Sequence, residues 1–291
     1  MTDMLWRLLP GCLAALATAC SHAPAPAPAR PSAPAETARA TPLAIGETFR
    51  LGSRVLAEER VINVYLPPGY AEGDARYPVL YLLDGGLHED FPHITGLVDV
   101  STKNQIIRPV IVVGIENTDR RRDLVGPTSV PEEKEIAPRA GGADRFRQFL
   151  RDELKPEIAR RYRVTSEAAL VGESFAGLFV LETLFVEPAL FDTYIAVDPS
   201  VWWNQQSLVK SAAERFASWS AAPKELYLAT ADSELTQDGA AMVLAAFREH
   251  APPGLTIHHA PMPEERHGTI FPVAALRAFR MLFAAASPPG E

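Results

Sequence analysis

Hydrophobic and polar residues alternate in blocks along the chain from about residue 48 onward. Short runs rich in Val, Ile, Leu and Tyr recur, and stretches with helical spacing of apolar residues separate them. Runs that are apolar at nearly every position are typical of strands buried on both faces of a parallel sheet. The pattern predicts seven such strands, at residues 60–67, 78–84, 110–116, 168–173, 193–199, 225–231 and 255–262.

Helices are predicted between and after these strands, at residues 143–161, 175–187, 205–218, 237–250 and 269–285. The alternation of strands and helices indicates a doubly wound α/β fold, with a mostly parallel sheet flanked by helices. In such folds a ligand site lies at the carboxyl ends of the strands. The sequence shows no internal repeat and no second linker, so residues 43–291 are predicted to form a single domain.

The first 42 residues have a different pattern and are excluded from that domain. Residues 1–20 contain a short apolar run that ends in small residues, which is typical of a secretory signal. The run ends at Ala17-Thr18-Ala19-Cys20, which resembles a bacterial lipobox, so Cys20 is a candidate lipidation site; ordinary cleavage after Ala19 is the alternative. Residues 21–42 contain six Pro and eight Ala and are predicted to be an extended linker.

Charge and cysteine content narrow the function. The formal net charge of −8 argues against a nucleic-acid partner, since phosphate binding depends on clustered Lys and Arg. The two cysteines, Cys12 and Cys20, both lie in the targeting segment, so the predicted domain has no disulfide and no cysteine nucleophile. His258 and His259 are consecutive in a predicted strand and point to opposite faces, so no metal site is expected there. The domain is expected to be exported, to the periplasm or as a membrane-anchored lipoprotein.

The strongest chemical signal is Gly172-Glu173-Ser174-Phe175-Ala176-Gly177 between a buried strand and a helix. A serine in this context is typical of the nucleophile elbow of α/β-hydrolases, a turn that needs small residues two positions away. Gly172 meets this need, and Ala176 stands where a second glycine is usual. The alternative is an ordinary serine cap at a strand–helix junction.

A serine nucleophile needs a histidine base, which follows it in the chain order of this fold. His267 lies in the loop between the last strand and the last helix and is the predicted base; the alternative is an ordinary surface histidine. The acid that orients the histidine is expected after the strand at 225–231, where Asp232 and Glu234 are both candidates.

An oxyanion hole needs two backbone N–H groups beside the nucleophile. One is predicted from Phe175, the residue after the serine. The other is predicted from the loop after the strand at 78–84, where Gly85 and Gly86 permit close approach of the backbone, with Gly86 preferred as the donor. The alternative for these glycines is a simple turn.

Several segments together resemble the putative-esterase family, which includes esterase D-like enzymes, trilactone siderophore esterases and mycolyl transferases. They are the elbow, Tyr77–Gly85, Asn117–Leu124, Asp198-Pro199-Ser200-Val201-Trp202-Trp203 and His267-Gly268. The resemblance spans residues 44–285 and implies a serine esterase that needs no cofactor. It favours Glu234 over Asp232 as the acid, because Ala231-x-x-Glu234 is similar to a pattern of the family.

The resemblance also places the loop at 117–124 beside the site, and this loop begins a long, charged stretch at 117–142. Loops of this length in compact domains are usually functional or disordered. Arg120, Arg121 and Arg122 then become candidate contacts for an anionic, catecholate or iron-chelate substrate, or else a solvated charge run. Trp202 and Trp203 become candidate pocket walls, with one expected in the core and the other at the rim.

The sequence therefore predicts ester hydrolysis through an acyl-enzyme, on a siderophore trilactone or a related aromatic or acyl ester. Two alternatives remain. An acyltransferase would use the same three residues with an alcohol acceptor. A non-catalytic ligand-binding protein of the same fold would normally have lost a catalytic residue, and here none is missing.

Overall fold

The computed structural model describes residues 40–217, 219, 223–232 and 234–285, and residues 43–291 form one compact unit. Within the described residues, eight strands form one sheet in the order β1-β2-β4-β3-β5-β6-β7-β8. Their bounds are β1 Glu47–Ser53, β2 Glu58–Tyr65, β3 Tyr77–Leu82, β4 Ile111–Ile115, β5 Val164–Glu173, β6 Thr193–Val197, β7 Lys224–Ala231 and β8 Leu255–Met262.

The sheet is parallel from β4 to β8, and antiparallel where β1 pairs with β2 and β2 with β4. This confirms the mostly parallel doubly wound sheet and all seven predicted strands. Strand β1 was not predicted. It pairs on one side only, and most of its residues are exposed, so it lacks the continuous apolar run of a central strand.

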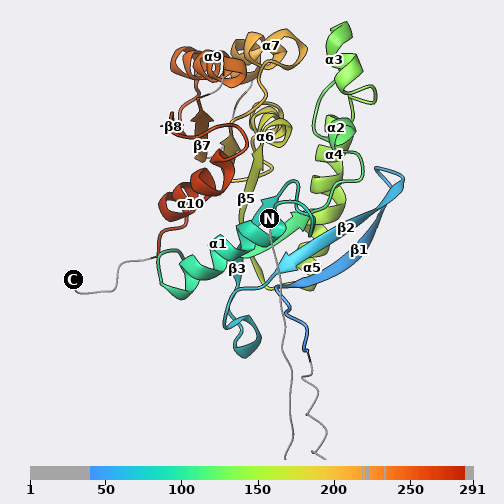
Figure 1. Ribbon diagram of the computed structural model, residues 1–291, viewed down its shortest axis with the longest axis vertical. Helices are drawn as coiled ribbons and strands as arrows, with labels where there is room; N and C mark the ends of the chain where they lie inside the picture. Colours follow the sequence, from blue (N-terminus) through green and yellow to red (C-terminus); the bar gives the residue numbers. More distant parts are fainter. Residues whose placement is uncertain (1–39, 218, 220–222, 233, 286–291) are drawn as a thin grey trace, which may run out of the picture. The chain divides into compact units, whose positions relative to one another are not determined.

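Helices cover both faces of the sheet (Figure 1). Their bounds are α1 Phe91–Lys103, α2 Arg120–Asp123, α3 Pro131–Ile136, α4 Ala143–Phe149, α5 Lys155–Arg161, α6 Phe175–Val186, α7 Trp203–Lys210, α8 Ala212–Ala217, α9 Glu234–His250 and α10 Ile270–Leu282. A 3₁₀ turn spans Tyr70–Glu72, and a π-helical turn, Leu150–Leu154, joins α4 to α5. The helix expected at 143–161 is thus continuous through this turn, and α1 is an element that the pattern did not predict.

Two hydrophobic cores lie on opposite faces of the sheet. One is formed with α1 and α10, which pack against each other over β3, β5 and β6. The other is formed with α4, α5, α6, α8 and α9. Helix α6 is the most enclosed helix of this second core, since ten of its residues are buried. The start of α6 directly follows Ser174, so this packing fixes the segment that carries the predicted nucleophile.

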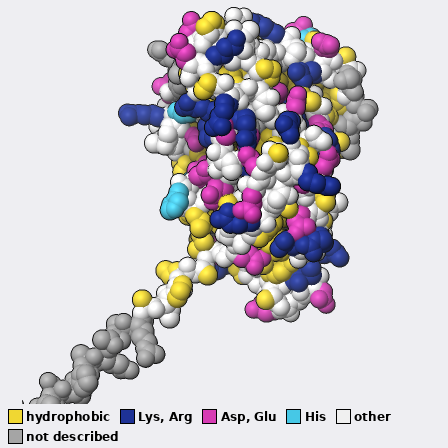
Figure 2. Space-filling view, turned by 90° about the vertical axis from the view of Figure 1, so that its right-hand side faces the viewer, with side chains coloured by type: hydrophobic (Ala, Val, Ile, Leu, Met, Phe, Trp, Pro, Cys, Tyr) yellow, Lys and Arg dark blue, Asp and Glu magenta, His cyan; other side chains and the backbone are white. Residues whose placement is uncertain are grey.

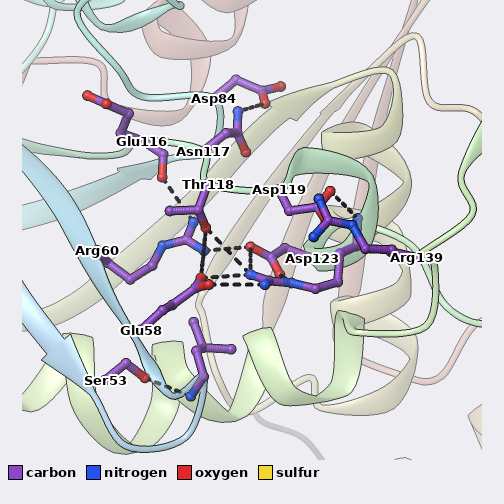
Figure 3. Close-up of polar contacts among 12 residues, drawn as sticks. Ser53, Glu58, Arg60, Asp84, Glu116, Asn117, Thr118, Asp119, Asp123 and Arg139 are labelled. Atoms are coloured by element: carbon purple, nitrogen blue, oxygen red, sulfur yellow. Dashed lines mark hydrogen bonds and ion pairs between the residues drawn. The ribbon is translucent and has the colours of Figure 1, made fainter.

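A buried charge network anchors the segment that follows β4. Arg60 of β2 is fully buried, and its Nη1 donates to Asp123 Oδ2 at 2.5 Å and to Glu58 Oε1 at 2.9 Å. Arg122 donates to both carboxylates as well, at 2.7 Å to Glu58 and 2.6 Å to Asp123. Figure 3 shows Glu58, Arg60, Thr118 and Asp123 converging from β2 and from the segment after β4. The long stretch at 117–142 is therefore tied to the sheet by charge pairs and contains α2 and α3.

Candidate active site

Ser174 occupies the sharp turn between β5 and α6, with φ 61° and ψ −120°. A positive φ is uncommon for serine and is typical of a strained nucleophile elbow. The turn is closely packed, because a Cβ on Gly172 would lie 2.6 Å from the Cβ of Ala176, and one on Gly177 would lie 2.9 Å from Val197 O. The small residues expected around the serine are therefore required by the backbone.

The turn is bonded to the segment after β6. Ser174 N–H donates to Val197 O at 3.0 Å, and Ser200 N–H donates to Ser174 O at 3.1 Å. The hydroxyl Oγ of Ser174 lies 3.2 Å from Ser200 Oγ, within hydrogen-bonding distance. Residues 197–200 thus lie directly against the nucleophile turn, and Asp198 belongs to this segment.

His267 lies in the turn between β8 and α10, the place that the sequence predicts for it, and its side chain is half-exposed. Its Nδ1 is 2.6 Å from Asp198 Oδ2. This hydrogen bond raises the pKa of His267 above its ordinary value of 6.5; burial opposes the effect, and the charges of Glu173 and Asp198 strengthen it. With Nδ1 donating to the carboxylate, Nε2 is the nitrogen that can accept a proton.

The carboxylate that the structure places beside His267 is Asp198, not one of the two expected. Asp198 is fully buried at the end of β6, and its Oδ1 accepts the N–H of Ala231 at 3.1 Å. Its carboxylate is therefore fixed between β6 and β7 and fills the place beside His267. Asp232, after β7, is exposed, and its N–H donates to Glu265 O. The side chain of Glu234 lies outside the described side chains. Only the family resemblance pointed to Asp198-Pro199-Ser200, and the sequence assigned it no catalytic role.

The two glycines after β3 are also placed differently from the expected oxyanion hole. Gly85 N–H donates to Ile115 O at 2.9 Å, and Gly86 N–H donates to Glu89 Oε2 at 2.7 Å. Gly86 can therefore serve an oxyanion only if Glu89 releases it. The backbone of this turn does pack closely against the neighbouring strand, because a Cβ on Gly85 would lie 2.3 Å from the Cα of Gly114.

The three consecutive arginines do not form one cluster. Arg120 donates from Nε and Nη2 to the two oxygens of Asp84, at 2.7 and 2.8 Å. The same guanidinium lies 3.3 Å from Glu173 O, and 5.9 Å from the ring centre of Phe175, so it stands beside the nucleophile turn. Arg121 donates to Ile136 O, and Arg122 belongs to the charge network with Glu58. Only Arg120 of the three lies at the site.

The two tryptophans divide as the sequence predicts. Trp203 is buried, and its Nε1 donates to Gly126 O at 3.0 Å. Trp202 is partly buried, with its ring 5.7 Å from that of Phe175. Trp202 therefore supplies aromatic surface near the nucleophile, whereas Trp203 supports Phe175 from the core.

Two carboxyl groups near the nucleophile were not predicted. Glu173 directly precedes Ser174; burial raises the pKa of its carboxyl to about 7, opposed by His267. Burial likewise raises the pKa of Asp90 to about 7, with a further contribution from the charge of Asp84. Their positions carry no recognisable motif, because a single Glu within the elbow and an Asp before α1 are ordinary sequence features.

Within the part of the chain that the structure describes, no group of three His, Cys, Asp or Glu side chains is arranged to hold a metal ion. No helix in this part is long and apolar enough to cross a membrane. Figure 2 shows basic side chains lying among acidic ones on one face of the molecule.

Comparison with known proteins bears on the family and the fold of the chain. A family model described as "Putative esterase" matches residues 53–259. The ferri-bacillibactin esterase BesA of Bacillus subtilis is 31% identical over 248 residues, which cover 77% of this chain and 85% of that protein. An IroE-like serine hydrolase from Shewanella oneidensis has a structure with a TM-score of 0.75 and 32% identity, covering 82% of this chain and 80% of its own. The siderophore hydrolase EstB of Aspergillus nidulans shares the fold, with a TM-score of 0.71 and 22% identity.

Proposed function

The chain belongs to the putative-esterase family and is an ester hydrolase of α/β-hydrolase fold, and from this premise we propose that Ser174, His267 and Asp198 are its catalytic triad. The observation that carries the proposal is the 2.6 Å hydrogen bond between His267 Nδ1 and buried Asp198, a carboxylate held next to the strained Ser174 turn. A base oriented by a buried acid beside a serine at an elbow is the arrangement that acyl transfer requires.

In the proposed reaction, Ser174 Oγ attacks the ester carbonyl carbon while His267 Nε2 takes the hydroxyl proton. The tetrahedral intermediate then breaks its bond to the alcohol oxygen, which leaves with the proton from His267. Water repeats the sequence on the acyl-enzyme, giving the carboxylic acid and free Ser174. Asp198 stabilises the imidazolium in both steps. The hydroxyl of Ser200 accompanies Ser174 in the resting site and must release it for attack.

Negative charge on the ester oxygen needs donors beside the elbow. Phe175 N–H is at the start of α6, where backbone donors have no partner within the helix. Arg120 also lies beside the elbow, against Phe175, with its guanidinium charge paired to Asp84. We include both in the proposed site; Gly86 joins them only after Glu89 has moved.

The proposed substrate is an ester of the siderophore type. The support is the similarity to the ferri-bacillibactin esterase over most of both chains, together with the half-buried Trp202 beside Phe175, which offers an aromatic surface to a substrate. Members of the family differ in the esters they act on, so the chemistry of the site has to indicate which class of ester this chain hydrolyses.

We further propose that the enzyme is exported and attached to a membrane through lipidated Cys20, with residues 21–42 as a spacer. The support is the lipobox-like Ala17-Thr18-Ala19-Cys20 and the Pro- and Ala-rich composition that follows it. These residues precede the compact unit that contains the proposed triad.

Replacement of the nucleophile tests the catalytic proposal. Ser174→Ala is expected to lower kcat on p-nitrophenyl acetate by about 10³-fold or more, because the hydroxyl that forms the proposed acyl-enzyme is gone. The wild-type enzyme should also be labelled by a fluorophosphonate and the variant should not, as read by intact mass. Ser207→Ala, on α7, is the matched control and should keep both activity and labelling. Full activity or labelling of Ser174→Ala would refute the assignment.

A further inference from the structure

Two of the acidic groups at the proposed site have a direct side-chain partner. Asp84 is held by both Nε and Nη2 of Arg120, and Asp198 is held by His267. Arg120 is thus already committed to a carboxylate. Its remaining contacts, to Glu173 O and the Phe175 ring, hold it beside the nucleophile turn.

Three further carboxyl groups at this site, Glu89, Asp90 and Glu173, form no ion pair with a Lys or Arg among the described residues. Among the described residues, Glu89 accepts hydrogen bonds from neutral donors, namely Gly86 N–H and both the backbone N–H and the side-chain amide of Asn117. Asp90 lies 3.6 Å from His93 Nε2, but burial lowers the pKa of His93, so His93 is neutral at pH 7 and does not balance the charge.

Glu173 is the most exceptional of these groups. Its Oε1 is inaccessible to solvent and has no hydrogen-bond partner among the described residues. A buried carboxylate oxygen without a donor is unfavourable, so a positive charge near Glu173 would be stabilised and a negative one disfavoured. The charged groups that act on Glu173 are His267, Asp90, Asp198 and Arg120, which places its carboxyl within the charge environment of the catalytic base.

The charges therefore do not favour an anionic ester. A substrate anion would meet the unbalanced carboxylates Glu173 and Asp90, while Arg120 is neutralised by Asp84. A cationic or donor-bearing substrate would instead favour the ionised forms of both groups. Burial is the largest cause of the raised pKa values of Glu173 and Asp90, each about 7, and the charges of neighbouring carboxylates raise both further.

Resting on the esterase function proposed above, we propose that Glu173 and Asp90 make this site select esters that carry a positive charge, with uncharged esters next and anionic esters last. Among siderophore-type esters, this favours neutral or amine-bearing compounds over anionic ones. Glu173 is the main specificity determinant, since it directly precedes the nucleophile.

Three thioesters of similar size test the charge preference with the wild-type enzyme: acetylthiocholine, its uncharged isostere S-(3,3-dimethylbutyl) thioacetate, and the anionic S-(2-sulfoethyl) thioacetate. Thiol release is followed at pH 8, and kcat/KM is corrected for the hydroxide-catalysed rate of each compound. We expect about tenfold preference for the cation over the neutral isostere and about tenfold discrimination against the anion, the effect of one pKa unit of differential interaction. The preference for the cation should diminish as the pH falls to 6, because Glu173 and Asp90 become protonated.

Variants assign the preference to particular residues. Glu173→Gln should reduce the cation-to-neutral ratio toward one, and Asp90→Asn should reduce it in part. Glu249→Gln, an exposed glutamate on α9, is the matched control and should keep the wild-type ratio. Each cation-to-neutral ratio compares two substrates on the same enzyme. A general loss of activity lowers both rates equally, so it does not change this ratio.

The outcomes separate the two proposals. Three results would overturn the inference and leave the esterase function intact, provided that the neutral thioester is hydrolysed. The enzyme would show no charge preference, or it would prefer the anion, or it would show a cation preference that Glu173→Gln and Asp90→Asn leave unchanged. Failure to hydrolyse any of the three thioesters or p-nitrophenyl acetate would instead overturn the proposed function.

Discussion

At the scale of single residues, the catalytic proposal depends on one hydrogen bond. His267 is useful as a base only when neutral, and the bond to Asp198 both fixes its tautomer and raises its pKa above 6.5. A group whose pKa is raised stays protonated to higher pH, so activity should fall as the pH drops through a value above 6.5. The acid limb of the pH–rate profile therefore reports on Asp198.

Replacement of Asp198 tests this link. Asp198→Asn is expected to lower kcat on p-nitrophenyl acetate by about 10³–10⁴-fold and to move the acid limb to lower pH, because the carboxylate that raises the His267 pKa is gone. The measurement is kcat/KM between pH 5 and 9. Asp232→Asn is the comparison: if it caused the larger loss, or if the limb of Asp198→Asn did not move, the acid would have to be sought after β7.

At the scale of elements, the segment after β4 is held in place by charge pairs with β2. Glu58 is central to them, since it accepts hydrogen bonds from Arg60, Thr118 and Arg122. Burial alone would raise the pKa of Glu58, but these hydrogen bonds lower it to about 2. The segment carries Arg120 to the nucleophile turn, so the network affects both stability and the site.

Glu58→Gln should therefore lower the free energy of unfolding by about 2 kcal/mol at pH 7, because two guanidinium groups lose a charged acceptor. The folded-state pKa lies below the ordinary value of 4.5, so this stabilisation is present above pH 4.5 and is lost as the pH falls toward 2. Urea unfolding measures this effect: the free energies of unfolding of Glu58→Gln and wild type should differ strongly at pH 7 and only slightly at pH 3.

Glu59→Gln provides a matched control for this experiment, since Glu59 pairs with Arg50 at the exposed edge of the sheet. Exposed pairs contribute at most about 1 kcal/mol, so this variant should unfold close to wild type. Equal effects of the two substitutions, or a difference for Glu58→Gln that did not depend on pH, would contradict a role for the buried network.

At the scale of the whole molecule, attachment and catalysis are expected to be separable. Both cores and the proposed triad lie within residues 43–291, which form one compact unit. Cys20 and the Pro- and Ala-rich residues 21–42 precede that unit.

Cys20→Ala should accordingly move the protein from the membrane fraction to the soluble fraction of a bacterial host, while kcat and KM on p-nitrophenyl acetate stay as in wild type. Fractionation followed by immunoblotting and assay measures both. Cys12→Ala, within the same predicted signal, is the control and should fractionate like wild type. Identical fractionation of Cys20→Ala and wild type would remove the case for a lipid anchor.

Local features of the sequence determined the fold class and pointed to the elbow and to the proposed base. Strands buried on both faces of a sheet must be apolar at nearly every position, so seven of them were visible as apolar runs. The glycines around Ser174 were visible for a similar reason, since neighbouring backbone excludes side chains there. His267 could be identified because it alone among the histidines follows the last strand in a loop.

Only the tertiary structure decided which charged groups meet. Asp198, Asp232 and Glu234 all follow strands, and the choice of Asp198 depends on its carboxylate being held between β6 and β7 beside His267. Likewise, the sequence presents Arg120, Arg121 and Arg122 as equivalent, but the fold gives each a different partner. Such pairings depend on distances between residues far apart in the chain, which a pattern of hydrophobic and polar positions does not contain.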